Sequence, residues 1–325
     1  MKAIICKNWG LPSTLTYMDV PDPVPADDEV LIKVHACSVN FPDTLIIQGL
    51  YQFKPELPFS PGSDVAGVVE AIGSKIKHVK VGEEVIGMAT FGGFAEKIVV
   101  KGPTVFAKPQ GMNMVNAASF LLAYGTSYHA LKDRARLKEG QSLLVLGASG
   151  GVGLAAVELG KKMGARVIAA ASTADKLALC KEYGADEVIN YTEEDLKNRV
   201  KELTNKKGVD VIYDPVGGDF SEPALRAIAR NGRYLVVGFA AGDIPKIPLN
   251  LALLKECQIV GVFWGQFAQK DMMKNFQNVA QLVQWFIGGE LKPHIHATYP
   301  LVDAPKALEE VMERKVKGKV VITMD

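Results

Sequence analysis

The residues best suited to chemistry are four glycines, Gly147, Gly150, Gly151 and Gly153, which follow an apolar run and precede a segment with helical spacing. Glycines in a turn from strand to helix allow a tight bend and let the backbone approach a pyrophosphate. The N-terminus of the following helix offers N–H groups and the positive end of its dipole. A turn that binds nothing could have this pattern, but its context favours a dinucleotide site in which Gly150, Gly151, Val152 and Gly153 hold the pyrophosphate.

The choice of nucleotide depends on the end of the next apolar run, about 20 residues further on, where NAD sites commonly place an acidic residue on the ribose 2′-OH. This sequence has the small neutral residue Ala171 there, followed by Ser172, Thr173 and Lys176. Hydroxyl and ammonium donors suit a 2′-phosphate. The sequence therefore favours NADPH over NADH, with a solvated helix lysine as the alternative role of Lys176.

Short apolar runs alternate with helical segments around this loop, which predicts a parallel sheet covered by helices on both faces. The expected strands are residues 142–146, 166–171, 187–191, 209–213 and 233–238. The expected helices are residues 152–163, 174–183, 194–204 and 220–230. Several of these helices end at a glycine, which is typical of a left-handed helix cap.

The first third of the chain has a different pattern, with short strands expected at residues 29–36, 65–72 and 84–87 between frequent prolines and glycines. This pattern predicts a compact β-rich domain. The tail is mixed, with a helix at 272–288, a strand at 294–300, a helix at 304–315 and a strand at 319–324. Periodicity does not decide which domain the tail joins.

Composition narrows the class of protein. The 325 residues include 37 basic and 36 acidic side chains and are 48% hydrophobic, which excludes global disorder and disfavours nucleic acid as the main partner. No apolar stretch is convincing as a membrane span, and the N-terminal residues lack the apolar core of a signal peptide. The four cysteines form no CxxC pair. We therefore expect a cytoplasmic protein with thiols that are structural.

Several motifs together resemble the zinc-free quinone oxidoreductase branch of the medium-chain dehydrogenase/reductase superfamily, over essentially the whole chain. These motifs are residues 40–43 (NFPD), 61–73 (PGSDVAGVVEAIG), 125–131 (GTSYHAL), 149–153 (SGGVG), 184–186 (GAD), 189–191 (INY), 213–218 (YDPVGG) and 232–238 (GRYLVVG). Residues 262–265 (VFWG) resemble the quinone oxidoreductase-like subgroup in particular.

The resemblance implies an α/β protein of two domains. A GroES-like, β-rich catalytic domain would comprise residues 1–122 and 265–325, and a Rossmann domain with a doubly wound parallel sheet would comprise residues 123–264 and bind NADPH. The active site would lie in the cleft between them. Family members often pair through an edge strand of the Rossmann sheet, so the resemblance also implies a homodimer.

The resemblance also implies the absence of zinc. Zinc-dependent members of the superfamily have a cysteine where this chain has Asn40, a histidine where it has Ser63, and a third ligand near Leu122. Even a catalytic zinc needs three protein donors. We therefore expect no metal, and we expect His294 and His296 to be ordinary surface or core residues.

The same resemblance assigns candidate catalytic residues. Asn40 and Asp43 would line the cleft near the nicotinamide, with the Asn40 amide able to donate to a substrate oxygen. Tyr51 would donate to the developing oxyanion or enolate. Asp43 could instead be a turn or helix-cap residue, and Tyr51 a half-buried aromatic. Many quinone oxidoreductases have a second tyrosine where this chain has Leu45.

Further residues would contact the cofactor by resemblance. Thr126 would meet the nicotinamide, and Phe263 and Trp264 would offer backbone groups to its carboxamide, although Trp264 could be a core aromatic. The adenosine phosphate would be held by Ser172, Lys176 and Tyr191. The nicotinamide ribose would be approached by Gly238, Phe239 and Ala240.

The expected function is hydride transfer from NADPH to a quinone or an α,β-unsaturated carbonyl compound, a small-molecule acceptor that needs no Lewis acid. Residues 49–58 also resemble enoyl thioester reductases, so reduction of an enoyl-CoA or enoyl carrier protein is one alternative. An NADPH-binding protein with little turnover, in a crystallin-like or RNA-binding role, is the other.

Overall fold

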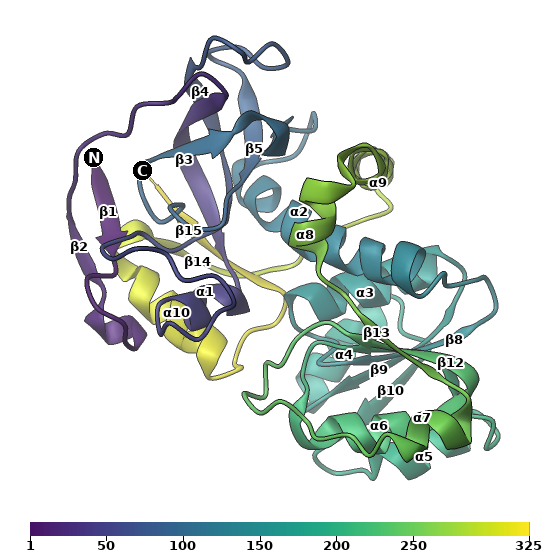
Figure 1. Cartoon of the computed structure of the whole chain (residues 1–325). Helices are drawn as coiled ribbons and strands as arrows, with labels where there is room; N and C mark the ends of the chain where they lie inside the picture. The colour runs from purple at the N-terminus through teal and green to yellow at the C-terminus, as the bar shows by residue number, and fades with distance from the viewer. Residues whose placement is uncertain (325) are drawn as a thin grey trace. The chain divides into compact units, whose positions relative to one another are not determined.

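The structure, a computed structural model, describes residues 1–324. The chain divides into two compact units (Figure 1). The first unit comprises Met1–Leu122 and Pro293–Asp325, and the second comprises Ala123–Lys292. Helix α2 (Met114–Tyr128) runs across the first point of division and continues as one turn of π-helix, His129–Arg134.

The second unit is built on a six-stranded sheet in which every pair of neighbours is parallel. Its strands are β8 (Ser142–Leu146), β9 (Arg166–Ala171), β10 (Glu187–Asn190), β11 (Val209–Asp214), β12 (Ile228–Val236) and β13 (Gln258–Gly261). They lie in the order β10-β9-β8-β11-β12-β13, which is the doubly wound Rossmann order. The chain winds outward from β8 and then restarts at β11 on its other side, so the point of reversal lies between these two strands.

Helices cover both faces of this sheet, as the alternation of strands and helices predicts. The connecting helices are α3 (Gly151–Lys162), α4 (Ala174–Glu182), α5 (Leu196–Leu203), α6 (Ser221–Arg226) and α7 (Asn250–Lys255). In Figure 1, α3 lies above the sheet, whereas α5 and α6 lie below it. Helices α3 and α4 each end two residues before a glycine, Gly164 and Gly184, with Met163 and Tyr183 as the cap residues between them. The two glycines have positive φ angles of 79° and 100°, a conformation that glycine adopts at little cost.

One expected boundary in this unit is wrong. A helix was expected over residues 220–230, but α6 ends at Arg226 and β12 begins at Ile228. Alanine, isoleucine and arginine are acceptable helix residues, so the local sequence does not mark the change. Pairing decides it, because Ile228 lies opposite Val209 and the register then shifts before Arg233 meets Val211.

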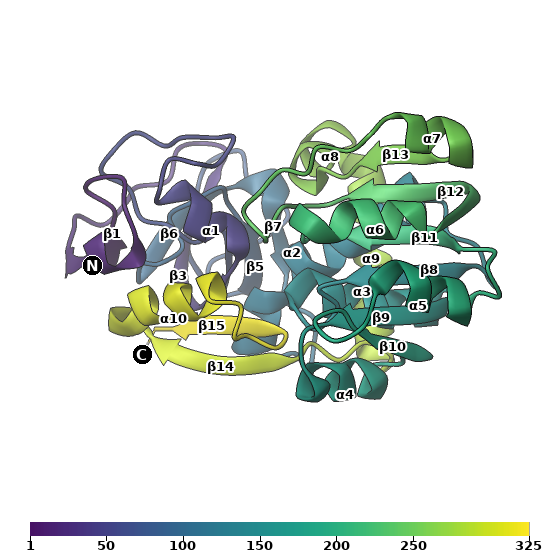
Figure 2. The same cartoon turned by 90° about the horizontal axis from the view of Figure 1, so that it is seen from below.

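The first unit contains a seven-stranded sheet in the order β14-β15-β3-β4-β5-β7, with β6 also paired to β3. Its strands are β3 (Glu29–Val39), β4 (Asp64–Ile72), β5 (Glu84–Met88), β6 (Lys97–Lys101), β7 (Val105–Ala107), β14 (Ile295–Pro300) and β15 (Lys319–Thr323). Strands β1 (Lys2–Ile5) and β2 (Thr16–Asp19) form a separate pair. Helix α1 (Phe41–Ile46) follows β3, and Figure 2 shows α10 (Ala304–Met312) over β14 and β15.

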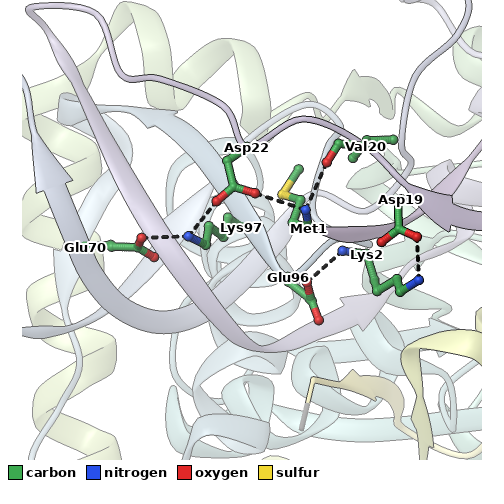
Figure 3. Close-up of polar contacts among 8 residues, drawn as sticks. All are labelled: Met1, Lys2, Asp19, Val20, Asp22, Glu70, Glu96 and Lys97. Atoms are coloured by element: carbon green, nitrogen blue, oxygen red, sulfur yellow. Dashed lines mark hydrogen bonds and ion pairs between the residues drawn. The ribbon is translucent and has the colours of Figure 1, made fainter.

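Ion pairs fasten the outer strands of the first unit. The ammonium of Lys97 on β6 lies 2.7 Å from a carboxylate oxygen of Asp22 and 2.7 Å from one of Glu70 on β4 (Figure 3). The ammonium of Lys2 on β1 lies 2.6 Å from Asp19 on β2. These pairs join neighbouring strands and loops at the surface, while apolar side chains of the sheet form the core of the unit.

The chain returns to the first unit later than expected. The return was expected at residue 265, but α8 (Trp264–Lys270) and α9 (Met272–Ile287) belong to the second unit, and the first unit resumes at Pro293. Aromatic contacts explain the difference. Phe267 on α8 stacks on His129 with ring centres 3.9 Å apart, and Trp285 on α9 meets the edge of Tyr128 at 5.3 Å. Among residues 1–324, no helix is both long and apolar enough to span a membrane.

Candidate functional site: a nucleotide loop and a buried carboxylate cluster

The predicted phosphate loop lies at the carboxyl end of β8, at the reversal point of the sheet. Gly147 has a φ of +56°, and a Cβ there would lie 2.7 Å from Val216, which follows β11. A Cβ on Gly153 would lie 2.2 Å from the carbonyl oxygen of Gly147. Both positions therefore require glycine for close packing. The loop ends at Gly150, and α3 begins at Gly151 with N–H groups that have no partner within the helix.

A buried chain of hydrogen bonds connects the start of α3 to α2 and β11. The hydroxyl of Ser127 on α2 donates to the carbonyl oxygen of Val152 at 2.8 Å. The same Ser127 hydroxyl lies 2.9 Å from the hydroxyl of Tyr213, which is fully buried on β11. Since Ser127 uses its hydrogen on Val152, Tyr213 donates to Ser127. The chain fixes the start of α3 relative to α2 and β11.

The residues expected to meet the adenosine phosphate gather at the carboxyl end of β9. The Lys176 ammonium lies 3.5 Å from the Ser172 hydroxyl, one helical turn away. The backbone N–H of Tyr191 donates to the carbonyl oxygen of Ala171, and the Tyr191 ring lies 4.3 Å from that of Phe220. Ala171 ends the strand where an acidic residue would favour a ribose 2′-OH. This end of the sheet therefore offers an ammonium and a hydroxyl that could donate to a phosphate.

The turn after β11 is held by Asp214, a residue whose role was missed in the sequence. One Asp214 carboxylate oxygen accepts from the N–H groups of Val216 and Gly217 at 2.8 and 2.9 Å. The other accepts from the hydroxyls of Ser221, at 2.8 Å, and Tyr234. In the sequence, Asp214 is marked only by its place in residues 213–218 (YDPVGG). That motif does not reveal that its carboxylate accepts hydrogen bonds from four donors.

This turn after β11 also fixes the position of the predicted ribose contacts. The N–H of Ala240 donates to the carbonyl oxygen of Pro215 at 3.0 Å, and the N–H of Gly238 donates to that of Asp214 at 3.3 Å. A Cβ on Gly217 would lie 2.8 Å from the Phe239 ring. The structure therefore brings residues 238–240 to the carboxyl end of β11, next to the strand that precedes the phosphate loop.

The residues predicted at the nicotinamide are partly structural. A Cβ on Gly125 would lie 2.6 Å from the Trp264 ring, and the indole N–H donates to the Asn275 side chain at 3.1 Å. The Trp264 side chain is therefore a core aromatic, and only its backbone can serve a ligand. Phe263 is 53% exposed, and Thr126 follows Gly125 on α2, so the Gly125 contact brings the helix of Thr126 to residues 263–264.

In the first unit, Asn40 and Asp43 belong to a buried polar cluster with Ser38, Asp64 and Lys319, here called the carboxylate cluster. Asp64 accepts from the Ser38 hydroxyl and from the Asn40 side-chain amide, each at 2.6 Å. The Asn40 backbone N–H donates to Asp43 at 2.7 Å, and the Asn40 side-chain oxygen accepts from Lys319.

This arrangement changes what Asn40 can do. The two hydrogens of its amide are directed at Asp64 and at the Ser38 hydroxyl, the latter at 3.2 Å. Asn40 would have to break a hydrogen bond to a buried carboxyl before it could donate to a substrate oxygen, which is costly. Asn40 is better suited to orienting Asp43 and Asp64. Asn40 is also the N-cap residue of α1, where its backbone N–H donates to the carboxylate of Asp43 in a capping box.

The electrostatics of the cluster favour proton exchange near neutral pH. Burial raises the pKa of Asp43 to about 7, although the N–H groups of Asn40 and Gly62 and the charge of Lys319 act in the opposite direction. Burial likewise raises the pKa of Asp64. Burial, and then the negative charge of Asp43, raise the pKa of Tyr51, which is half-buried after α1. The charge of Asp43 therefore acts on the Tyr51 hydroxyl.

The donor set does not fit a zinc ion. Asn40 and Ser63 stand where the zinc-dependent relatives supply cysteine and histidine. Within residues 1–324, no three histidine, cysteine, aspartate or glutamate side chains are grouped so that they could hold a metal. Tetrahedral zinc needs at least three such donors from the protein.

The chain has relatives among known proteins. The family described as zinc-binding dehydrogenase matches residues 151–285, and the family described as alcohol dehydrogenase GroES-like domain matches residues 26–110. A quinone oxidoreductase-like protein 2 homolog of Nematostella vectensis is 39% identical, with 99% of this chain and 88% of the relative covered. The quinone oxidoreductase of Homo sapiens is 35% identical, with 100% of this chain and 98% of the relative covered.

The fold also has solved counterparts. The crystal structure of Escherichia coli quinone oxidoreductase complexed with NADPH has a TM-score of 0.94 and 29% sequence identity, covering 99% of this chain and 100% of that chain. The doubly wound sheet and the glycine loop at its reversal point agree with the fold of these relatives. This chain belongs to the quinone oxidoreductase family of the medium-chain dehydrogenase/reductase superfamily and is an oxidoreductase of that family.

Proposed function

We propose that this protein transfers hydride from NADPH to a quinone or to an α,β-unsaturated carbonyl compound. The observation that carries the choice of NADPH is the end of β9, where Lys176 and Ser172 stand 3.5 Å apart and Ala171 replaces an acidic residue. An ammonium and a hydroxyl are donors to a 2′-phosphate, whereas a ribose hydroxyl gains from a carboxylate. The NADPH complex of the related Escherichia coli enzyme supports the same choice.

The residues of the second unit would bind and orient the cofactor, which supplies the hydride when it is bound. The N–H groups at the start of α3 would bind the pyrophosphate, as the glycines leave room for its approach. The loop of residues 238–240, held by Asp214 and Pro215, would contact the nicotinamide ribose. Thr126 and the backbone of Phe263 and Trp264 would contact the nicotinamide end.

The residues of the first unit would handle the proton. Hydride addition places negative charge on an oxygen of the acceptor, and a proton must reach that oxygen or its enolate carbon. Tyr51 would donate from its hydroxyl, and its half-buried position limits access of water. Asp43 would return a proton to Tyr51, since its pKa of about 7 allows both protonation states near neutral pH.

Purified protein given NADPH with a naphthoquinone or with crotonyl-CoA, followed at the absorbance of NADPH, tests this proposal. We expect kcat/KM for the quinone to exceed that for the thioester by at least about tenfold, which is about 1.4 kcal/mol of transition-state preference. The opposite ratio would make the protein an enoyl thioester reductase. Tight NADPH binding without turnover of either compound would instead support a binding role.

We also propose a homodimer that pairs through the edge of the second unit. Strand β13 ends the sheet, and Ile259 on it is 43% exposed. Leu253 and Leu254, on α7 just before it, are 75% and 69% exposed. An apolar sheet edge of this kind favours pairing with another chain. Light scattering that gives the mass of a single chain at micromolar concentration would contradict it.

A further inference from the structure

A buried lysine far along the chain joins the carboxylate cluster. Lys319 begins β15, and the next residue, Val320, pairs with Val39 at the end of β3. Asn40 follows β3 directly, and Asp64 begins the next strand of the sheet, β4. Three adjacent strands, β15, β3 and β4, therefore bring Lys319, Asn40 and Asp64 to the same end of the sheet.

The ammonium of Lys319 is buried and directed into the cluster. Lys319 is 6% exposed, and its ammonium donates to the side-chain oxygen of Asn40 and lies 3.4 Å from the carbonyl oxygen of Val39. A buried ammonium loses its hydration and is stable only where other groups compensate it. Neutral acceptors such as these give partial compensation, and the remainder must come from opposite charge.

Two carboxyls supply that charge. Asp43 is 2% exposed and Asp64 is fully buried, and the charge of Lys319 acts on both of them. One oxygen of Asp64 has no hydrogen-bond partner within residues 1–324, so that carboxyl depends on nearby charge as well as on its bonds to Ser38 and Asn40. The cluster thus has one cation for two carboxyls that repel each other.

The bond to Asn40 adds an effect on orientation. Because Lys319 donates to the oxygen of the Asn40 carboxamide, the amide nitrogen must point the other way, toward Asp64 and Ser38. A rotation of the carboxamide by 180° would place the amide hydrogens against the ammonium. Lys319 thereby determines which end of Asn40 faces the carboxyls.

We propose that Lys319 is a positioning residue of this site, whose buried ammonium orients the Asn40 carboxamide and supplies the positive charge that Asp43 and Asp64 share. The inference deepens the function proposed above, because it makes the proton affinity of Asp43, and through it of Tyr51, depend on a residue of the C-terminal strand. The titratable groups that face Asp43 are Asp64 on β4, Lys319 on β15, Cys37 on β3 and Tyr51 after α1.

Carbon NMR of protein labelled at the aspartate carboxyls tests the inference directly. The Asp43 signal is assigned by its loss in Asp43→Asn. We expect Lys319→Met, which keeps the apolar stem, to raise the apparent pKa of Asp43 by at least one pH unit, a tenfold change in proton affinity. Lys319→Arg should keep the value near that of the original protein. The control Lys315→Met removes an exposed ammonium paired with Glu313 in the same unit and should leave the titration unchanged.

A charge cycle keeps the test decisive if Lys319→Met does not fold. Asp64→Asn removes one of the two negative charges and should lower the apparent pKa of Asp43. The double variant Asp64→Asn, Lys319→Met removes a cation and an anion together, which leaves less uncompensated charge buried. Adding Lys319→Met to Asp64→Asn should then raise the Asp43 value again. An Asp43 titration that does not respond to Lys319 in either background would overturn the proposal.

The proposed reductase function and the positioning role of Lys319 can be rejected independently of each other. If no quinone or enone is reduced but the Asp43 titration follows Lys319, the proposed function is wrong and the positioning role remains. If turnover occurs, the alkaline limb of kcat/KM, where Asp43 loses the proton that it returns to Tyr51, should move to higher pH in Lys319→Met and return in Lys319→Arg. Turnover with an unmoved alkaline limb and an unmoved titration would leave the proposed function standing and reject the role of Lys319.

Discussion

Lys176 and Ser172 lie 3.5 Å apart at the carboxyl end of β9, at the point where an acidic residue would select NADH. We expect Lys176→Ala to raise the KM for NADPH by about tenfold or more and to change the KM for NADH little, because the proposed contact of the ammonium is with the 2′-phosphate, which NADH lacks. Steady-state kinetics with both cofactors measures the two values. An equal effect on both would remove Lys176 from the phosphate site.

A matched control for this variant lies on the same helix. Lys181 on α4 donates to the backbone oxygen of Asp186, away from the end of β9. Lys181→Ala removes the same charge from the same helix. We expect it to leave the KM for NADPH unchanged within about twofold, so a comparable rise would point to a general loss of positive potential instead of a specific contact.

A second prediction concerns two glycines of the phosphate loop, Gly150 and Gly153. A Cβ at Gly150 would meet only the Gly147 oxygen, at 3.4 Å, and its φ of −78° suits any residue. A Cβ at Gly153 would lie 2.2 Å from the same oxygen. We expect Gly150→Ala to weaken NADPH binding with a stability change below about 1 kcal/mol, whereas Gly153→Ala should weaken binding and also destabilise the fold by about 2 kcal/mol or more.

Urea unfolding and NADPH titration of the two variants separate these effects. The comparison tests whether the loop is a binding site and not merely a tight turn. If Gly150→Ala bound NADPH as tightly as the unchanged protein, the pyrophosphate would not approach the backbone at this point.

Much of the second unit could be predicted from sequence because its signals are local. The strands β8 and β9 have the expected bounds, since each is a short apolar run closed by turn residues. The glycine loop is also local, as its four glycines lie within seven residues. What the sequence could not supply is pairing between distant segments, which decided where β12 begins and placed α8 and α9 with the second unit.

The candidate site was predictable to the same degree. Asn40, Asp43 and Tyr51 lie in one short stretch with a recognisable motif, so resemblance could find them. Lys319 is 279 residues from Asn40, and only the pairing of β15 with β3 brings them together. Asp214 was visible as part of a motif, but its four donors come from a turn, a helix and a neighbouring strand. Hydrogen bonds of this kind depend on tertiary structure, which periodicity does not describe.

Asp43 makes the stability of the fold depend on pH. Its pKa is about 7 in the folded protein and about 4 in an unfolded chain. Between these values the folded state binds more protons than the unfolded state, so the contribution of Asp43 to stability is full below about pH 4 and is lost as the pH rises toward 7. We expect this group alone to lower the free energy of unfolding by on the order of 1 kcal/mol per pH unit across that window.

Urea unfolding of the original protein and of Asp43→Asn between pH 4 and 8 measures the contribution of Asp43 to the pH dependence of the free energy of unfolding. The free energy of unfolding of the original protein minus that of Asp43→Asn should fall as the pH rises from about 4 to about 7 and be constant above about pH 7 to 8. A difference that is flat throughout would mean that Asp43 titrates at an ordinary pH and is not suited to exchanging a proton with Tyr51.

Tyr51 provides the prediction that bears most directly on chemistry. Its ring packs against the apolar core of the first unit, and its hydroxyl is influenced by the charge of Asp43. Tyr51→Phe keeps the ring and removes only the hydroxyl, so we expect the fold to be unchanged. We expect kcat to fall by about 10²-fold or more, as for loss of a general acid, while the dissociation constant of NADPH stays within about twofold.

The choice of acceptor sharpens the test of Tyr51, because the two acceptor classes need the proton at different atoms. A quinone accepts the proton on oxygen, where water can also supply it. The enolate formed from an enone must accept the proton on its α-carbon to give the saturated carbonyl product. The loss of kcat in Tyr51→Phe should therefore be larger with an enone than with a naphthoquinone. The control Tyr17→Phe alters a tyrosine that is 42% exposed on β2 and should change neither rate. An unchanged kcat in Tyr51→Phe with both acceptors would show that the proton comes from another group, and Asp43 would then be the first candidate to test.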